Sequence, residues 1–304
     1  MVFKIRKLTI TIMFLLLLFT ESLYARDHHF SYYSDMPEIF LNVIENYRSS
    51  QPEACKQENG IIRGGIVTHH FLASRLMVDF FECLASQAEP ERIILIGPDH
   101  FAKGVYPITV SALPWKTPFG ELPADESIVS RIKELLNLSD DVEAFSGEHS
   151  IGIIVPFIRY YFPRSKIIPI IIQGQISMYT LVELKQIISQ LLNDHKTLVL
   201  LSMDFSHNQT SEEADQRDEN SRDAILQLDC KRISELDIDC RHGLFLLMAT
   251  LKELKTMNIY FRQHTNSAKI TGLKNLKDIT SYYTIFFYKQ DLSKQNDRGE
   301  KKDE

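Results

Sequence analysis

The chain has little of what marks several special classes of protein. Its 304 residues include 12 glycines, 11 prolines and four cysteines, too few for a collagen-like repeat or a disulfide-stabilised miniprotein. It has no excess of basic residues, and its formal net charge of −6 argues against a protein that binds nucleic acid. It also lacks a P-loop, a GxGxxG motif and the GxSxG elbow of serine hydrolases. Apolar residues make up 44% of the chain, which indicates a globular protein with a full core.

The first 25 residues have the order of a secretory signal peptide. The first seven residues carry three basic side chains, residues 8–20 are almost wholly apolar, and Ala25 ends a short cleavage-site segment. The apolar run is shorter than the roughly 20 residues needed to span a bilayer. We therefore predict cleavage after Ala25 and an exported, periplasmic or secreted protein. A retained membrane anchor is the alternative.

Export into an oxidising compartment permits disulfide bonds. Cys55, Cys83, Cys230 and Cys240 could form one or two bridges, and four cysteines allow three complete pairings. Cys83 is the one we least expect to pair. It lies beside a helical stripe of apolar residues, where a cysteine usually serves as a small buried side chain.

Short β-rich runs alternate with longer helical patterns through the body of the chain. We expect strands at 61–68, 92–96, 108–112, 166–173, 197–203, 259–263 and 282–288. We expect helices at 71–88, 125–136, 150–162, 178–193 and 244–257, with a charged helical stretch to about residue 236.

Strand segments such as 167–172 and 198–201 are apolar on both faces, as in a parallel sheet covered by helices. This pattern predicts one α/β domain, a three-layer α/β/α sandwich around a mostly parallel, mixed sheet. The domain would span residues 61–288, after a lead-in at 26–60. The polar segment 289–304 would form a solvated, disordered tail.

Histidine or aspartate follows the end of three predicted strands. His69 and His70 follow the first, Asp99 and His100 the second, and the segment 204–207 follows the strand at 197–203. Ligands bind beyond the carboxyl ends of strands in open α/β sheets, so these groups should converge. Imidazole suits iron, copper or zinc, which makes His69 and His100 candidate metal ligands.

Neighbouring polar residues have alternative interpretations. Asp99 and His70 are candidates for orienting a ligand's second ring nitrogen, although His70 should point away from His69 if the strand alternation continues. His149, at the start of a predicted helix, belongs either to a capping segment or to the site as an acid–base group. Asp204 and His207 could form an acid–base pair or a ligand with its support, or Asp204 could simply close the strand.

The segment 237–243 leads into the helix predicted at 244–257. Either Asp239 or Cys240 could complete a three-ligand metal site with His69 and His100. Asp239 could instead cap the helix, and Cys240 could pair with another cysteine. Spacing alone does not choose between them.

The order of these motifs resembles that of the Memo family, whose bacterial members are called AmmeMemoRadiSam system protein B. The resemblance covers roughly residues 61–288. Memo proteins are similar to class III extradiol dioxygenases of the LigB type, which implies an α/β fold. The motifs that carry it are Ile66-Val67-Thr68-His69, Gly97-Pro98-Asp99-His100, Thr117-Pro118, Glu148-His149-Ser150-Ile151, Ser202-Met203-Asp204-Phe205-Ser206-His207 and Arg241-His242.

The resemblance implies a metal site of two histidines and a cysteine, carried here onto His69, His100 and the segment 237–243. An ungapped match through Arg241-His242 places Asp239 at the family's cysteine position, and a shift of one residue would restore Cys240. We favour Asp239. His149, Asp204 and His207 match polar residues that line the family's pocket.

The two candidates for the third ligand, Asp239 and Cys240, imply different chemistry. Asp239 would give the two-histidine, one-carboxylate set of non-haem iron(II) oxygenases, whereas Cys240 would give a softer site for copper(I), iron or zinc. Our first hypothesis is an exported metal-binding or redox protein that holds iron or copper, or else zinc. The alternative is an extradiol-type dioxygenase for a small catechol-like aromatic, and a zinc hydrolase is weaker. The expected partner is a small aromatic substrate or another protein.

Overall fold

The computed structural model describes residues 30–289 except 32, 57, 256–257 and 274–276. The predicted signal peptide, and the predicted tail beyond residue 289, lie outside the described residues. Within the described part of the chain, no helix combines the length and the apolar character needed to cross a membrane.

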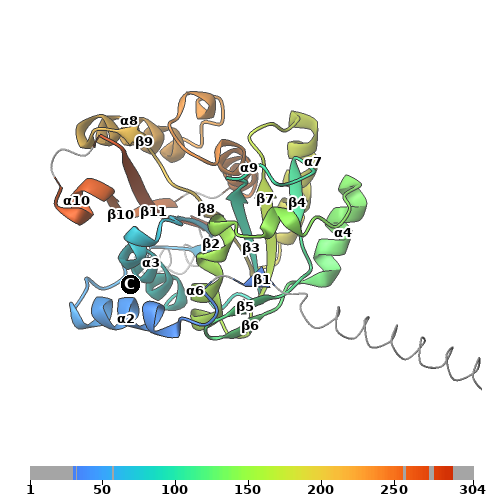
Figure 1. Cartoon of the computed structure of the whole chain (residues 1–304). Coiled ribbons are helices and arrows are strands. Elements are labelled where there is room, and N and C mark those ends of the chain that lie inside the picture. Colours follow the sequence, from blue (N-terminus) through green and yellow to red (C-terminus); the bar gives the residue numbers. More distant parts are fainter. Residues whose placement is uncertain (1–29, 32, 57, 256–257, 274–276, 290–304) are drawn as a thin grey trace, which may run out of the picture.

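Four parallel strands form the centre of the main sheet (Figure 1). They lie in the order β2 (Ile61–Val67), β8 (Thr197–Ser202), β3 (Arg92–Pro98) and β7 (Lys166–Ile172). Their carboxyl ends are nearly level, because Val67 pairs with Ser202 and Ile96 pairs with Leu201. This level edge is what brings polar residues after β2, β3 and β8 together.

Antiparallel strands complete the sheet on both sides, so it is mixed as predicted. β11 (Ile279–Lys289) pairs with β2 and with β10 (Asn258–Asn266), while β4 (Ile108–Val110) pairs with β7. β9 (His207–Gln209) pairs with the start of β11. A separate small sheet contains β1 (Phe30–Ser31), β5 (Trp115–Thr117) and β6 (Gly120–Leu122).

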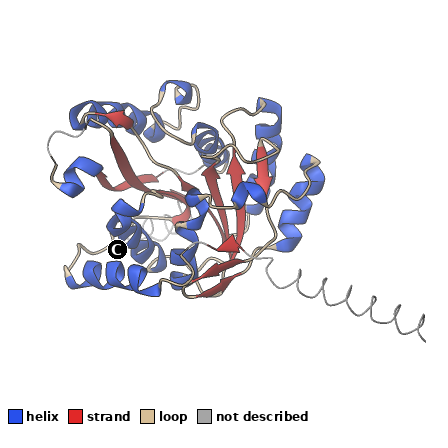
Figure 2. Cartoon of the chain, in the orientation of Figure 1, coloured by secondary structure: helices blue, strands red, loops and turns tan. Residues whose placement is uncertain are grey.

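Helices cover both faces of the main sheet (Figure 2). On one face α2 (Pro37–Ser49), α3 (Ser74–Ala85) and α6 (Ile154–Tyr161) share an apolar core with the strands. On the other face the core lies beneath α4 (Glu126–Leu136), α7 (Met178–Leu191), α8 (Ser211–Leu226) and α9 (Arg241–Glu253). The predicted α/β/α sandwich is therefore confirmed. The described residues also include two short α-helices, α5 (His149–Gly152) and α10 (Ser267–Thr271).

The segment we described only as a lead-in contains a full helix. In α2, Pro37 occupies the first turn, and Phe40, Ile44 and Tyr47 are buried against the domain. Their spacing of four and three residues is the mark of an amphipathic helix. This pattern was readable in the sequence and extends the domain toward its N-terminus.

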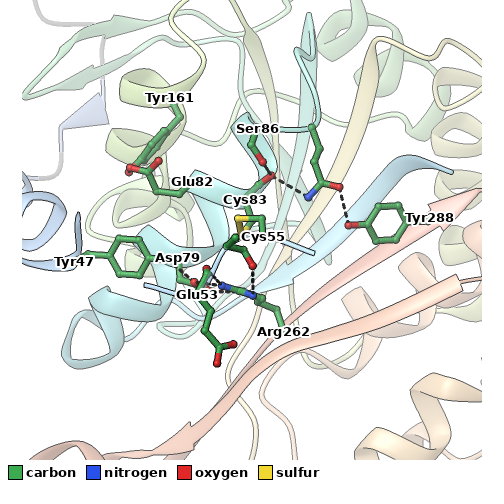
Figure 3. Close-up of a disulfide and its surroundings, with 12 residues drawn as sticks. Tyr47, Glu53, Cys55, Asp79, Glu82, Cys83, Ser86, Tyr161, Arg262 and Tyr288 are labelled. Atoms are coloured by element: carbon green, nitrogen blue, oxygen red, sulfur yellow. Dashed lines mark hydrogen bonds and ion pairs between the residues drawn. A yellow bond between two sulfur atoms is a disulfide. The ribbon is translucent and has the colours of Figure 1, made fainter. Parts of the chain in front are cut away.

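Our expectation for Cys83 was wrong, because it forms a disulfide with Cys55 (Figure 3). The helical pattern correctly predicted that Cys83 is buried in α3. It could not show that the segment after α2 brings Cys55 to that helix. Cys230 and Cys240 are free thiols, so no bridge removes Cys240 from the candidate ligands.

A polar cluster holds the same region together. Both oxygens of the buried Asp79 accept hydrogen bonds from Arg262 of β10, each at 2.9 Å, and Asp79 also accepts one from Tyr47 of α2 at 2.5 Å. Arg262 donates further to the carbonyl of Glu53 at 2.9 Å (Figure 3). The disulfide and this cluster together join α2, α3 and β10.

Candidate metal centre

His69 lies directly beyond β2 and is almost fully buried. Its Nδ1 is 3.1 Å from the hydroxyl oxygen of Ser202, at the end of β8. That hydroxyl donates its own hydrogen to the carbonyl of Ser150 at 2.5 Å, so it accepts from the ring. His69 is therefore protonated at Nδ1, and in the neutral ring Nε2 carries a free lone pair.

His100, beyond β3, is oriented in the same way by a different acceptor. Its Nδ1 is 2.8 Å from Oε1 of Glu148, and its backbone N–H donates to Oε2 at 2.9 Å. A carboxylate only accepts hydrogen bonds, so Nδ1 of His100 carries the hydrogen. Nε2 is again the nitrogen left for a ligand.

The orienting groups are not the ones we expected from the sequence. Asp99 accepts from the backbone N–H groups of Lys103 and Gly104 and so braces the loop after β3. The Nδ1 of His70 contacts the hydroxyl of Tyr282 and does not support His69. The sequence signal for Glu148 was its position beside His149, in a segment that we interpreted either as a helix cap or as part of the site.

Asp239 completes the group from the segment before α9. Its Oδ2 lies 3.2 Å from Nε2 of His69 and 3.7 Å from Nε2 of His100. The backbone N–H of Asp204 donates to both of its oxygens, at 3.2 and 3.1 Å. Burial would raise the pKa of the Asp239 carboxyl, but the two histidines hold that pKa well below its usual range. Asp239 is therefore an anion that faces two ring nitrogens.

Cys240 is a structural residue of the apolar core. Its side chain is buried in the apolar core, and its sulfur lies beside Gly243 in the first turn of α9. Burial and the neighbouring Asp239 charge raise the pKa of this thiol well above its usual value, which disfavours the thiolate that metals bind. Among the described residues, the groups spaced closely enough to share an ion contain no cysteine.

His149 lies against the two ligand candidates. Its ring stacks on His100 with centroids 4.1 Å apart and lies 5.2 Å from the ring of His69. Burial, together with the neighbouring His100 and His69, lowers the pKa of His149 to about 4. His149 is therefore neutral at pH 7 and able to accept a proton or bind a metal.

Asp204 also belongs to the group, whereas His207 lies at its margin. Asp204 Oδ1 accepts from the Thr68 hydroxyl and from the His69 backbone N–H, and Oδ2 is 3.8 Å from Nε2 of His69. His207, on β9, is in none of the groups of described residues that are spaced closely enough to share an ion. Within the described part of the chain Asp204 and His207 share no hydrogen bond, so the direct pair we considered is not formed.

Two overlapping sets therefore have ligand atoms close enough to share one ion. One is formed by His69, His100 and His149, and the other by His69, Asp204 and Asp239. Beside them lies a cavity of about 220 Å³, whose lining includes His100 and Asp239. A larger hollow of about 660 Å³ lies at the opposite, amino-terminal edge of the sheet and is lined by none of these residues.

A third set, Asp215, Asp218 and His264, lies apart from this centre. Its members already have partners in the protein. Asp218 accepts from Ser206, Ser281 and His264, and Asp215 pairs with Lys269. These contacts explain the set as a structural brace between α8, β10 and β11.

Comparison with known proteins agrees with the fold and the motifs. A MEMO1 family protein of Pyrobaculum aerophilum is 32% identical over 240 residues, which cover 74% of this chain and 83% of the relative. One from Sulfurisphaera tokodaii is 32% identical over 217 residues, which cover 67% and 74%. The crystal structure of an uncharacterized protein from Escherichia coli K12 superposes with a TM-score of 0.52 at 12% identity. The superposition covers 74% of this chain and 99% of the E. coli chain. At this identity the similarity supports the fold alone.

The family model described as Memo-like protein matches residues 27–285. This range begins before α2 and ends within β11, so it includes every residue of the candidate centre. The chain therefore belongs to the Memo-like family.

Proposed function

We propose that this protein binds one divalent transition-metal ion through Nε2 of His69, Nε2 of His100 and the carboxylate of Asp239. The observation that carries this proposal is the approach of both Nε2 atoms to the same carboxylate oxygen, at 3.2 and 3.7 Å. Each ring has its other nitrogen held by a specific acceptor, Ser202 or Glu148. Such orienting partners accompany most histidines that bind metals.

Charge supports the same conclusion. A lone pair on each Nε2 and an ionised Asp239 repel one another unless a cation lies among them. That cation is either a proton on the rings or a metal ion. A divalent ion satisfies all three groups at once and leaves neither ring charged, whereas a proton satisfies one ring at a time.

The donor set favours iron(II). Two histidines and one carboxylate with open positions are typical of non-haem iron(II) oxygenases. Copper also binds imidazole and is the second candidate, followed by zinc. His149 shares one close group with His69 and His100, and Asp204 shares another with His69 and Asp239, so each is a candidate for a fourth ligand.

The role we propose is metal binding with a redox function, and the alternative is an extradiol-type dioxygenase for a small catechol-like aromatic. In that alternative the metal would supply sites for oxygen and substrate. Neutral His149 would accept a substrate proton, with His207 as a second candidate and Asp204 as the residue that positions Asp239. A zinc hydrolase is the weaker alternative, and a protein partner could replace the small substrate.

We also propose that the protein acts outside the cytoplasm. The apolar segment at residues 8–20 follows three basic residues, and Ala25 offers a cleavage point. The disulfide between Cys55 and Cys83 supports this proposal, because such bonds persist mainly in oxidising compartments.

Elemental analysis of residues 26–304, purified without chelators or an affinity metal, tests the metal site. We expect close to one iron per chain in the wild type and in Cys240→Ala, and less than a tenth of that in Asp239→Ala and His100→Ala. Metal retained by Asp239→Ala but lost from Cys240→Ala would replace our third ligand with the thiol. Wild-type metal content in His100→Ala would refute the site.

A further inference from the structure

The cavity beside the centre is small. It holds about 220 Å³, less than the roughly 300–1,000 Å³ typical of pockets for drug-sized ligands. Its lining includes His100 and Asp239 of the proposed metal site, and also Gln173, Arg241 and His242. A molecule that enters it therefore meets the proposed metal and this second group of polar side chains together.

The second group presents one cation and two hydrogen-bond acceptors. Nε and Nη2 of Arg241 both donate to the carbonyl of Leu236, at 3.1 and 2.9 Å, which fixes the guanidinium. His242 donates from Nδ1 to the carbonyl of Gln173 at 3.3 Å, so in the neutral ring Nε2 is an acceptor. The side-chain amide nitrogen of Gln173 is already bonded to Asp99 and Gly104, which leaves its oxygen as the second acceptor.

The charges of the side chains that line the cavity favour a single negative charge on the ligand. Asp99 and Asp239 are the two carboxylates of the lining, and Arg241 is its guanidinium. A divalent metal on His100 and Asp239 would leave the lining with one net positive charge. A monoanion neutralises this excess, while the two acceptors favour a hydroxyl group on the same molecule.

We propose that this cavity binds a small, singly charged hydroxy acid, with Arg241 facing its carboxylate and His242 accepting from its hydroxyl. The proposal rests on the metal site proposed above and names the class of ligand for that site. Arg241 would then determine specificity for anions without being a metal ligand.

Three probes of matched size test this assignment by calorimetry on the metal-loaded protein. Lactate carries both groups, propionate lacks the hydroxyl, and propane-1,2-diol lacks the carboxylate. We expect lactate to bind at least tenfold more tightly than either of the others. Arg241→Gln should weaken the binding of lactate about tenfold and leave the binding of propane-1,2-diol unchanged. Lys103→Gln is the matched control, because Lys103 is a cation near His100 that does not line the cavity.

A second variant keeps the proposal testable if Arg241→Gln does not fold. His242→Phe should weaken the binding of lactate but leave the binding of propionate unchanged. Equal binding of the three probes to the wild type would overturn the proposal, as would unchanged lactate affinity in a folded Arg241→Gln protein. The metal content of each sample separates the two proposals. If the wild type holds no metal, the metal site itself is refuted, and if it holds metal without preferring lactate, only the assignment of the cavity fails.

Discussion

The Nδ1 atom of His100 lies 2.8 Å from Oε1 of Glu148, a side chain that is fully buried 48 positions further along the chain. The same carboxylate also accepts the N–H of Ser150 and the backbone N–H of His100. Glu148 therefore fixes both the ring of His100 and the loop that carries it. It would act on a metal at this centre only through His100.

Replacement of Glu148 tests this role. In Glu148→Gln, an amide N–H₂ replaces one of the oxygens that accept from His100 and Ser150. The ring of His100 should then be held less firmly, and metal affinity should fall by about 10- to 100-fold. Competition with a chelator of known affinity measures the change. Glu143→Gln, at an exposed position, is the control and should bind metal like the wild type. Equal affinity in the two variants would show that Glu148 does not position His100.

The metal-free protein should be less stable in alkaline solution. Burial lowers the pKa of His100, but Asp239 and Glu148 outweigh it and raise this pKa to about 9. The unfolded value is about 6.5, so the charged ring contributes its full stability below pH 6.5 and loses it as the pH rises to about 9. We expect a loss of about 3 kcal/mol in the free energy of unfolding over this range.

Urea unfolding at a series of pH values in the presence of a chelator measures that loss. His100→Gln has no proton to lose, and its stability should change much less over the same interval. Metal affinity should follow the opposite trend, because the proton that leaves Nε2 of His100 frees it for a metal. A decline of equal size in His100→Gln would assign the effect to another group.

The bridge between Cys55 and Cys83 should contribute measurably to stability. Because 28 positions separate the two cysteines, Cys55→Ser should lower the free energy of unfolding by about 2–4 kcal/mol. Cys230→Ser is the matched control, since Cys230 is also half-buried but unpaired. The denatured, unreduced wild type should release two titratable thiols. Four thiols, or equal stability of the two variants, would contradict the bridge.

Substitution of Gly243 tests the position of the Cys240 sulfur. An alanine usually stabilises a helix relative to glycine by about 1 kcal/mol. Here the added Cβ would lie 2.5 Å from the sulfur of Cys240 and 2.6 Å from Leu201, so Gly243→Ala should destabilise the protein by about 1–3 kcal/mol. Part of this loss should return in the double variant with Cys240→Ala. Thermal unfolding of the four proteins measures the coupling, and additive effects would place the thiol elsewhere.

Much of the fold could be predicted from local patterns. The apolar strands and the helical stripes between them indicated the α/β sandwich, and they located the polar residues at the ends of β2, β3 and β8. His69 and His100 were found in this way, because a strand end sets the edge on which the next residue lies. The helix α2 carried an equally readable stripe at Phe40, Ile44 and Tyr47, and we overlooked it.

Residue patterns by themselves determined which side chains are buried and which follow the ends of parallel strands. Only the tertiary structure decided which of them meet. Asp239 and Cys240 are adjacent, yet the carboxylate faces the histidines while the sulfur packs in the apolar core beside Gly243. Glu148 and His100, like Cys55 and Cys83, are joined across long intervals of chain. Periodicity reports the environment of one element, whereas a contact between distant residues depends on how separate elements pack.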